Sequence, residues 1–179
     1  MSILQKYIDN GQLVVPSKQT EFTTIAIHGW DSADAQARMD NLITAYYADG
    51  RQLDAVLSPN DSLAIGIITS LRNAGYGTPE KPFPIITGQD CDKANVIAMI
   101  KGEQSMSIFK DTRTLAAKVV EMVEAIMKGE EAPVNDTKTY HNGVKQVPSF
   151  LCEPVYADVN NYKELLIDSG YYTEADLRQ

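Results

Sequence analysis

Cysteine, histidine and tryptophan are scarce in this chain, which has two, two and one of them among its 179 residues. Two cysteines, Cys91 and Cys152, are too few for a disulfide framework, so we expect two buried thiols, with a single disulfide as the alternative. The histidines, His28 and His141, lie far apart in the sequence, and neither has a closely spaced cysteine or histidine partner. The sequence therefore predicts no zinc site.

Positive charge is also in short supply, because 16 lysines and arginines stand against 24 aspartates and glutamates and leave a formal net charge of −8. Surfaces that bind nucleic acid or anionic membranes are rich in basic residues, so this balance disfavours both partners. No apolar run reaches the ~18 residues that a membrane-spanning helix needs. Residues 1–6 show no basic region followed by an apolar one, so no signal peptide is visible in this chain.

Short apolar runs alternate with stretches of helical periodicity, which is typical of an α/β fold with a parallel sheet flanked by helices. We expect helices over residues 3–8, 35–46, 62–74, 96–100, 112–126 and 161–167. We expect strands over residues 13–15, 24–27, 54–57, 83–87, 105–109 and 150–155. Residues 137–147 predict a hairpin with a type I′ turn at Asn142-Gly143.

The chain starts directly in a predicted helix. A parallel βα unit needs a strand before its crossover helix, and here that strand would lie upstream of Met1. We therefore expect that the sequence begins inside a fold whose first strand it does not contain.

Polar or aromatic side chains stand just past four of the predicted strands, namely Trp30, Asn60, Asp90 and Lys110. Because ligands of open α/β sheets bind outside the carboxyl ends of the strands, we expect these four residues to line one rim. An indole packs on the apolar face of a sugar ring, a carboxylate accepts hydroxyl protons, an amide both donates and accepts, and an ammonium donates. The set therefore predicts a binding site for a neutral polyhydroxylated ligand such as a pyranose.

Each of these residues also has a purely structural interpretation. Trp30 suits a half-buried packing position, and Lys110 suits a solvated turn. Asp61, next to Asn60, suits the cap of the following helix, and we favour that role for Asp61. Asp90 likewise suits the cap of the next helix. Only the shared position of the four candidates past strand ends favours a ligand site.

Sequence motifs of catalysis are missing, since the chain has no Gly-x-Ser-x-Gly elbow, no Gly-x-Gly-x-x-Gly loop and no P-loop. Cys91 lies beside Asp90 at a predicted helix start, where its thiol pKa would fall. No histidine base is placed near it by the sequence, so we favour a packing cysteine. We therefore expect no enzymatic activity and no cofactor.

Several separated motifs resemble those of one family. They are Gly-Trp-Asp at 29–31 with Ala-Gln-Ala-Arg-Met-Asp at 35–40, Leu-Ser-Pro-Asn-Asp at 57–61, Gly-Gln-Asp at 88–90 and Ile-Phe-Lys-Asp-Thr at 108–112. In this order they closely resemble the periplasmic monosaccharide-binding proteins of ABC sugar importers, of the galactose/ribose-binding type. Together with the segment at 135–145 they are similar to the multiple-sugar-binding subgroup, which handles glucose, galactose, arabinose and xylose. The resemblance covers nearly all of the chain.

The resemblance implies a role for each rim residue. Trp30 would stack on the sugar, Asn60 would hydrogen-bond its hydroxyls, and Asp90 would be the main carboxylate acceptor. Lys110 departs from the pattern, because the galactose binder has an amide at this position, so its role is less closely implied.

The resemblance also implies a periplasmic-binding-protein type I fold with two hinged lobes. Residues 1–110 and 151–179 would belong to the second, C-terminal lobe, without its first strand. Residues 111–150 would belong to the first lobe, most of which would lie upstream of this sequence. Because a missing central strand exposes backbone donors and acceptors, the isolated chain is expected to dimerise or to exchange elements.

The implied function is that of the solute-binding component of an ABC importer. Such a protein captures a monosaccharide between its lobes and delivers it to a membrane permease, with signalling to a chemoreceptor or sensor kinase as a further role. The parent protein would be periplasmic. Two alternatives are the sugar-responsive effector domain of a LacI-type transcriptional repressor, which shares the fold, and a small flavodoxin-like enzyme, which the missing phosphate loop disfavours.

Overall fold

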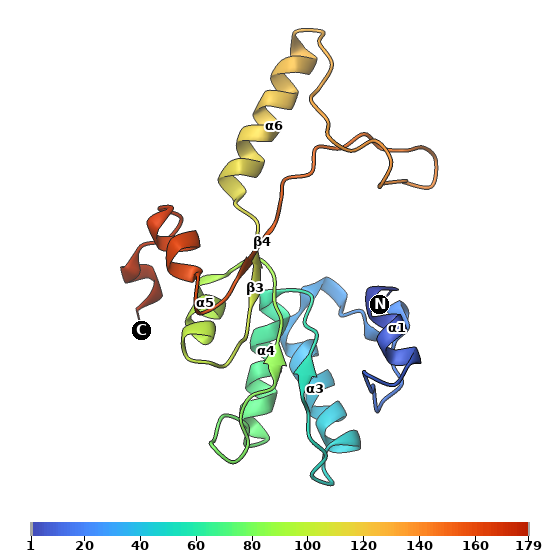
Figure 1. Ribbon diagram of the computed structural model, residues 1–179, viewed down its shortest axis with the longest axis vertical. Helices are drawn as coiled ribbons and strands as arrows, with labels where there is room; N and C mark the ends of the chain where they lie inside the picture. Colours follow the sequence, from blue (N-terminus) through green and yellow to red (C-terminus); the bar gives the residue numbers. More distant parts are fainter. Residues whose placement is uncertain (1, 179) are drawn as a thin grey trace.

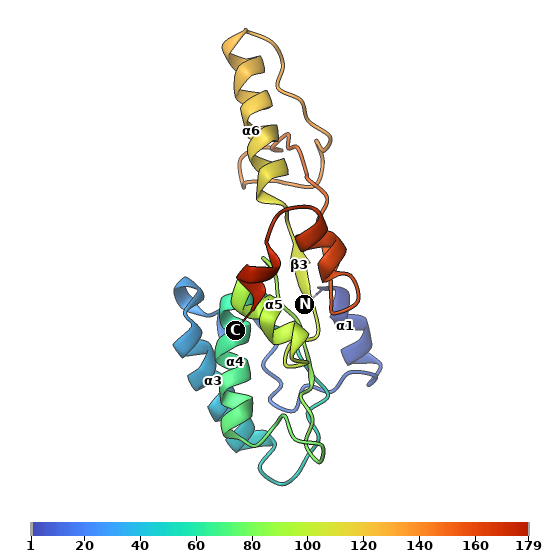
Figure 2. The ribbon, with the colours of Figure 1, turned by 90° about the vertical axis from the view of Figure 1, so that its left-hand side faces the viewer.

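The computed structural model describes residues 2–178 and shows a body from which a long arm projects (Figure 1). The body contains the helices α3 (Ser32–Tyr46), α4 (Asp61–Asn73) and α5 (Lys93–Ile100), which pack on four short strands. The arm consists of helix α6 (Thr112–Met127) and the irregular chain that returns from it (Figure 2). The other helical elements are α1 (Ser2–Asp9), α2 (Phe22–Ile25), the 3₁₀ turns η1 (His28–Trp30) and η3 (Glu174–Leu177), and the π-helical turn η2 (Lys163–Asp168).

The strands lie side by side in the order β1 (Ala55–Val56), β2 (Ile85–Ile86), β3 (Ser107–Phe109) and β4 (Val155–Ala157). Strands β1 and β2 are parallel, with Ala55 opposite Ile85. The extension of β2 joins β3 through a parallel bridge between Gln89 and Ile108, and β3 pairs antiparallel with β4. Because β1, β2 and β3 run in the same direction, their carboxyl ends share one edge, where the four candidate residues were expected.

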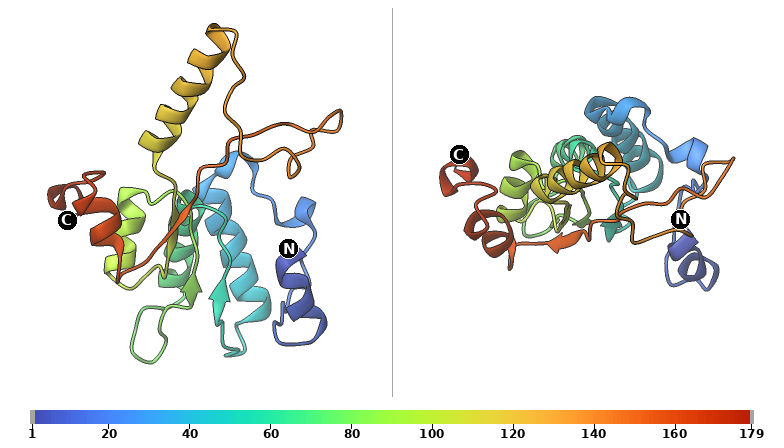
Figure 3. Two further views of the ribbon diagram at one scale, coloured as in Figure 1. Left: turned by 45° about the horizontal axis from the view of Figure 1, so that its top comes forward. Right: turned by 90° about the horizontal axis from the view of Figure 1, so that it is seen from above.

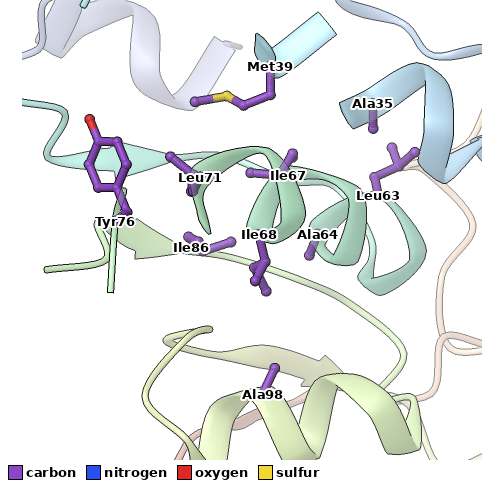
Figure 4. Packing of buried hydrophobic residues seen from close by; sticks show 10 residues of the cluster. All are labelled: Ala35, Met39, Leu63, Ala64, Ile67, Ile68, Leu71, Tyr76, Ile86 and Ala98. Atoms are coloured by element: carbon purple, nitrogen blue, oxygen red, sulfur yellow. The ribbon is translucent and has the colours of Figure 1, made fainter. Parts of the chain in front are cut away.

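The main core lies between α3, α4 and the strands (Figure 4). Helix α4 buries the side chains along most of its length because its apolar residues recur at helical spacing. A Cβ on Gly66 would come 2.1 Å from the carbonyl oxygen of Ser32, so only glycine allows this close approach of α4 to the start of α3. The buried residues of this core are Ala35, Met39, Leu63, Ala64, Ile67, Ile68, Leu71, Tyr76, Ile86 and Ala98.

A second core fixes the C-terminal segment to the body. Leu166 of η2 is buried with Phe109 of β3 and Cys91, which precedes α5. Tyr171 packs edge-to-face on Phe109, with 4.8 Å between the ring centroids. Lys93 forms an ion pair with Asp176, whose pKa it holds well below the ordinary value. The end of the chain therefore supports the region from which α5 begins.

Large apolar surfaces stay uncovered in this chain. Helices α3, α4 and α5 all lie on one side of the strands (Figure 3). Leu57 and Ile85, next to and within the strands, are exposed. Helix α6 leaves a whole apolar row exposed, made up of Leu115, Val119, Val120, Val123, Ile126 and Met127. Soluble proteins seldom leave such continuous apolar faces without a partner. Within residues 2–178, no helix combines the length and the apolar character needed to cross a membrane.

Five of the six predicted helices are confirmed, and the sixth, at 161–167, is found as the π-helical turn η2. Two predicted strands are wrong. Residues 22–25 form the short helix α2 instead of a strand. Residues 13–15 form no ladder, and the N–H of Leu13 instead donates to the carbonyl of Tyr7 and closes α1. In both places an apolar run has no neighbouring strand with which to pair. The strand predicted at 150–155 is found at Val155–Ala157, where β3 offers a partner.

The predicted hairpin is confirmed as a chain reversal but not as a pair of strands. The N–H of Val147 donates to the carbonyl of Tyr140, and His141 and Gln146 form a single antiparallel bridge. Four residues lie between these bridge partners, so the two-residue type I′ turn is wrong. The Asn142 side chain instead accepts from the N–H groups of Val144 and Lys145, which closes a longer turn.

Candidate ligand-binding rim

The loop that carries Trp30 is tied to the loop that carries Asn60. The Ser62 hydroxyl donates to the carbonyl oxygen of Trp30 (3.1 Å), and the Asn60 side-chain amide donates to the Ser62 hydroxyl (2.9 Å). The Trp30 side chain is 56% exposed, so its indole is not a core packing residue. An exposed indole at the carboxyl edge of the strands is free to pack against a ligand.

Asp90 and Lys110 meet at the carboxyl ends of β2 and β3. The Lys110 ammonium lies 3.0 Å from the Asp90 carboxylate, and both side chains are 40% exposed. An ion pair with this exposure contributes little to stability, and solvent or a ligand can share both charged groups. Neither side chain is therefore committed to a structural role.

The two halves of the rim are joined through the backbone. The N–H of Asp61 donates to the carbonyl oxygen of Gln89 at 2.9 Å, which places the Asn60 loop against the Asp90 loop. The structure thus brings the loops that carry Trp30, Asn60, Asp90 and Lys110 into one connected edge. Their predicted roles toward a sugar remain predictions, because geometry alone does not assign a ligand.

The helix caps differ from the expected ones. Asn60, not Asp61, is the N-cap of α4, and its side-chain oxygen accepts from the N–H of Leu63 at 3.1 Å. The cap predicted for Asp61 is therefore wrong. Asp90 caps no helix either, because α5 begins only after Asp92, whose side chain makes no cap hydrogen bond.

Three non-glycine residues in the loops of the rim adopt left-handed backbone conformations. They are Trp30 (φ 58°), Asp90 (φ 107°) and Cys91 (φ 54°). A side chain at positive φ costs of the order of 1–3 kcal/mol, and such strain gathers at functional sites where the surroundings hold it in place. Two of these residues are neighbours at the end of β2, so the structure around them must hold this loop firmly.

Asp61 is fully buried beneath the rim, a feature that the sequence did not reveal. Its carboxylate accepts from the Gln104 amide (2.9 Å), the Ser107 hydroxyl (2.9 and 3.0 Å) and the N–H of Asp92 (2.9 Å). Burial raises the pKa of Asp61 to about 6, because desolvation outweighs these hydrogen bonds. A Cβ on Gly88 would lie 2.0 Å from the Asp61 carboxylate, so Gly88 is the one sequence signal that a buried group lies here.

The two cysteines are free thiols, so the alternative of a disulfide is wrong. Cys91 is buried, as expected, and Cys152 is half-buried. Burial raises the pKa of Cys91 to about 12, which keeps it a neutral thiol and removes it as a candidate nucleophile. Within residues 2–178, no group of three or more His, Cys, Asp or Glu side chains is arranged to hold a metal ion.

The fold and its rim define a class of protein, the type I periplasmic binding proteins. The profile described as "Periplasmic binding protein domain" matches residues 1–131, and the chain belongs to this family.

Individual relatives are similar over the whole chain. The multiple sugar-binding periplasmic protein SbpA of Azospirillum brasilense is 52% identical over 99% of this chain and 49% of its own length. The D-xylose-binding periplasmic protein of Escherichia coli is 33% identical over 99% of the chain and 49% of its own length. The chain spans about half the length of the curated relatives that it matches.

A solved structure is also similar throughout. An ABC transporter solute-binding protein from Clostridium phytofermentans, crystallised with β-D-glucose, is 60% identical and superimposes with a TM-score of 0.92. The match covers 99% of this chain and 54% of that protein. Two of these relatives are thus named as sugar-binding periplasmic proteins, and the third is named as a solute-binding protein of an ABC transporter.

Proposed function

We propose that this chain supplies the sugar-binding second lobe of the solute-binding component of an ABC importer. The protein binds a monosaccharide between two hinged lobes and delivers it to the membrane permease. The observation that carries the proposal is the connected rim of Trp30, Asn60, Asp90 and Lys110, on a chain 60% identical to a protein crystallised with β-D-glucose. The protein acts by binding and not by catalysis.

In this proposal each rim side chain has one task. Trp30 stacks its indole on the apolar face of the sugar ring. Asn60 and Asp90 hydrogen-bond the hydroxyls, with the carboxylate as the stronger acceptor. Lys110 donates to a sugar oxygen while it stays paired with Asp90. The ligand belongs to the glucose, galactose, arabinose or xylose class, and two relatives are named with xylose and with glucose.

The proposed lobe boundaries follow the path of the chain. Residues 1–110 and 151–179 form the second lobe, and residues 111–150 belong to the first lobe. Two observations support this division: α6 projects away from the body (Figure 1), and the outgoing and returning chains lie together where Phe109 pairs with Val155. Bending at these neighbouring crossings would close the lobes around the ligand, provided that the ligand binds the closed state more tightly.

The proposed location is the periplasm and the proposed partner is the permease of the importer. A chemoreceptor or sensor kinase is a further partner that reads the closed, sugar-bound form. None of the three relatives favours the effector domain of a transcriptional repressor or a flavodoxin-like enzyme.

Titration calorimetry tests the proposal on the protein encoded by the complete gene. D-glucose, D-galactose, L-arabinose and D-xylose are titrated separately, and at least one should bind with a Kd of about 1 μM or tighter. Sucrose serves as a control, because a site that encloses one sugar ring excludes a disaccharide. An absence of binding heat with all four monosaccharides would contradict the proposal.

A further inference from the structure

The loop that carries Asp90 is held from below by a buried polar cluster, which we define as Asp61, Gln104 and Ser107. All three residues are buried, and none of them reaches the rim surface. The N–H of Cys91 donates to the Ser107 hydroxyl oxygen at 3.1 Å, and the next N–H, of Asp92, donates to the Asp61 carboxylate at 2.9 Å. Two consecutive backbone groups just after Asp90 thus end on this cluster.

In its carboxylate form Asp61 accepts hydrogen bonds and does not donate them, which suits it to hold this loop. Three donors converge on its carboxylate, from Asp92, Gln104 and Ser107. Gln104 is held in this orientation, because its amide also donates to the carbonyl of Met106 and its oxygen accepts from Asn95. An asparagine at position 61 would turn a donor toward these donors, and the buried groups would lose partners.

The same loop carries strained backbone. Asp90 and Cys91 both have positive φ, and the two N–H groups that donate to the cluster, those of Cys91 and Asp92, directly follow Asp90. On the other side, the Tyr172 hydroxyl donates to the carbonyl oxygen of Cys91 at 3.0 Å. Without these three bonds the loop would relax toward ordinary φ values and turn the Asp90 carboxylate away from the rim.

We propose that Asp61 and Ser107 are positioning residues that aim the Asp90 carboxylate at the ligand, with Tyr172 as a third support from the C-terminal segment. The inference rests on the proposed function, since it assigns the hidden support of one residue in that site. The three positioning side chains touch no ligand themselves. They would affect sugar affinity only through the orientation of the Asp90 carboxylate.

The chain offers a matched pair of variants. Ser107→Ala removes a hydroxyl that accepts from the N–H of Cys91 in the Asp90 loop. Ser105→Ala, two residues earlier, removes a hydroxyl that accepts from the N–H of Ile86 within β2. Each variant removes the side-chain acceptor of one backbone N–H, and Ser107→Ala also removes the hydroxyl that donates to the Asp61 carboxylate. Only Ser107 belongs to the cluster beneath the rim.

We expect Ser107→Ala to raise the Kd for the sugar at least tenfold in titration calorimetry on the protein encoded by the complete gene. Ser105→Ala should change the Kd less than twofold. In an Asp90→Ala background, Ser107→Ala should have less than a twofold further effect, because a positioning residue acts only through the group that it positions. Equal Kd effects of the two serine variants, or a full effect in the Asp90→Ala background, would overturn the proposal.

A second measurement needs no ligand and separates this proposal from the proposed function. Amide hydrogen exchange at Cys91 and Asp92 should become at least tenfold faster in Ser107→Ala and should stay unchanged in Ser105→Ala. If no monosaccharide binds the unmodified protein, the proposed function fails and these exchange rates alone decide the positioning role. Unchanged exchange at both amides would then overturn it.

If Ser107→Ala does not fold, a milder pair of variants gives the same decision. Tyr172→Phe removes the hydroxyl that donates to Cys91, whereas Tyr171→Phe removes a hydroxyl that contacts Thr112 at the base of α6. The first should raise the Kd about threefold and speed exchange at Asp92, and the second should do neither. Identical behaviour of the two tyrosine variants would count against the proposal.

Discussion

At the scale of single residues, the side chains of the rim are exposed to solvent, whereas the residue that supports them is buried. Trp30 is exposed, and its backbone carbonyl accepts a hydrogen bond from the Ser62 hydroxyl. Asp90 and Lys110 are paired with each other but still open to solvent. Asp61, by contrast, is buried, and in our proposal its removal would disturb the loop that carries Asp90 without removing any group from the rim surface.

Trp30→Ala should weaken monosaccharide binding about 30-fold, because a stacked aromatic ring contributes about 2 kcal/mol through buried area and ring contact. The melting temperature should change little, since the indole is exposed. Phe22→Ala, which truncates another exposed aromatic residue, is the control and should leave the Kd unchanged. Calorimetric titrations of the three proteins check this, and a Kd for Trp30→Ala within twofold of the parent would remove Trp30 from the site.

Asp61 should make stability depend on pH in a defined direction. Its pKa is about 6 in the fold and 3.8 as the ordinary value, so the folded state binds the proton more tightly than the unfolded chain. The stabilisation from protonated Asp61 is therefore present in full below about pH 4 and is lost as the pH rises through 6. A shift of about 2 pH units corresponds to about 3 kcal/mol.

Urea denaturation of the parent and of Asp61→Asn at pH 4, 5, 6 and 7 isolates this contribution. The free energy of unfolding of the variant, minus that of the parent, should rise by about 3 kcal/mol from pH 4 to pH 7. The other shifted carboxyl groups, including Asp92 with its raised pKa, are common to both proteins and largely cancel. A difference that stays constant over this range would show that Asp61 does not titrate there.

At the scale of helices and strands, the sequence predicted helices well and isolated strands poorly. The row of apolar residues in 61–73 specifies α4 by itself, because a helix satisfies its own backbone groups. The apolar run at 24–27 looks the same as a strand, but a strand also needs a neighbour, and none is present. Asn60, Asp90 and Lys110 were predictable because they follow the ends of β1, β2 and β3, whereas Trp30 lies in the turn η1 and follows no strand. The buried position of Asp61 depends on contacts with distant residues such as Ser107.

The close packing of α3 on α4 can be tested at Gly66. Gly66→Ala should lower the free energy of unfolding by about 2–3 kcal/mol, because the added methyl group would meet the backbone carbonyl of Ser32. Asn73→Ala, at the exposed end of the same helix, is the control and should stay within about 0.5 kcal/mol. Chemical denaturation measures both values. Equal stability of Gly66→Ala and the parent would mean that the two helices can separate without cost.

At the scale of the whole molecule, uncovered apolar faces should govern how the isolated chain behaves. Residues 1–179 expressed alone should form dimers or larger species, because the apolar row of α6 and the exposed sheet residues gain from contact with another copy. Sedimentation velocity measures the size distribution. Replacing Val119 and Val123 by lysine should raise the monomer fraction. A monodisperse monomer with a cooperative thermal transition would contradict this expectation.

The C-terminal segment also has a consequence for biosynthesis. Tyr172 and Asp176 leave the ribosome after all four rim residues, yet they brace the start of α5 and the carbonyl of Cys91. The nascent chain therefore carries every proposed sugar-contacting group of this lobe before the loop of Asp90 is braced. A premature stop codon near residue 170 would leave all four rim residues in place and should still weaken the proposed sugar binding.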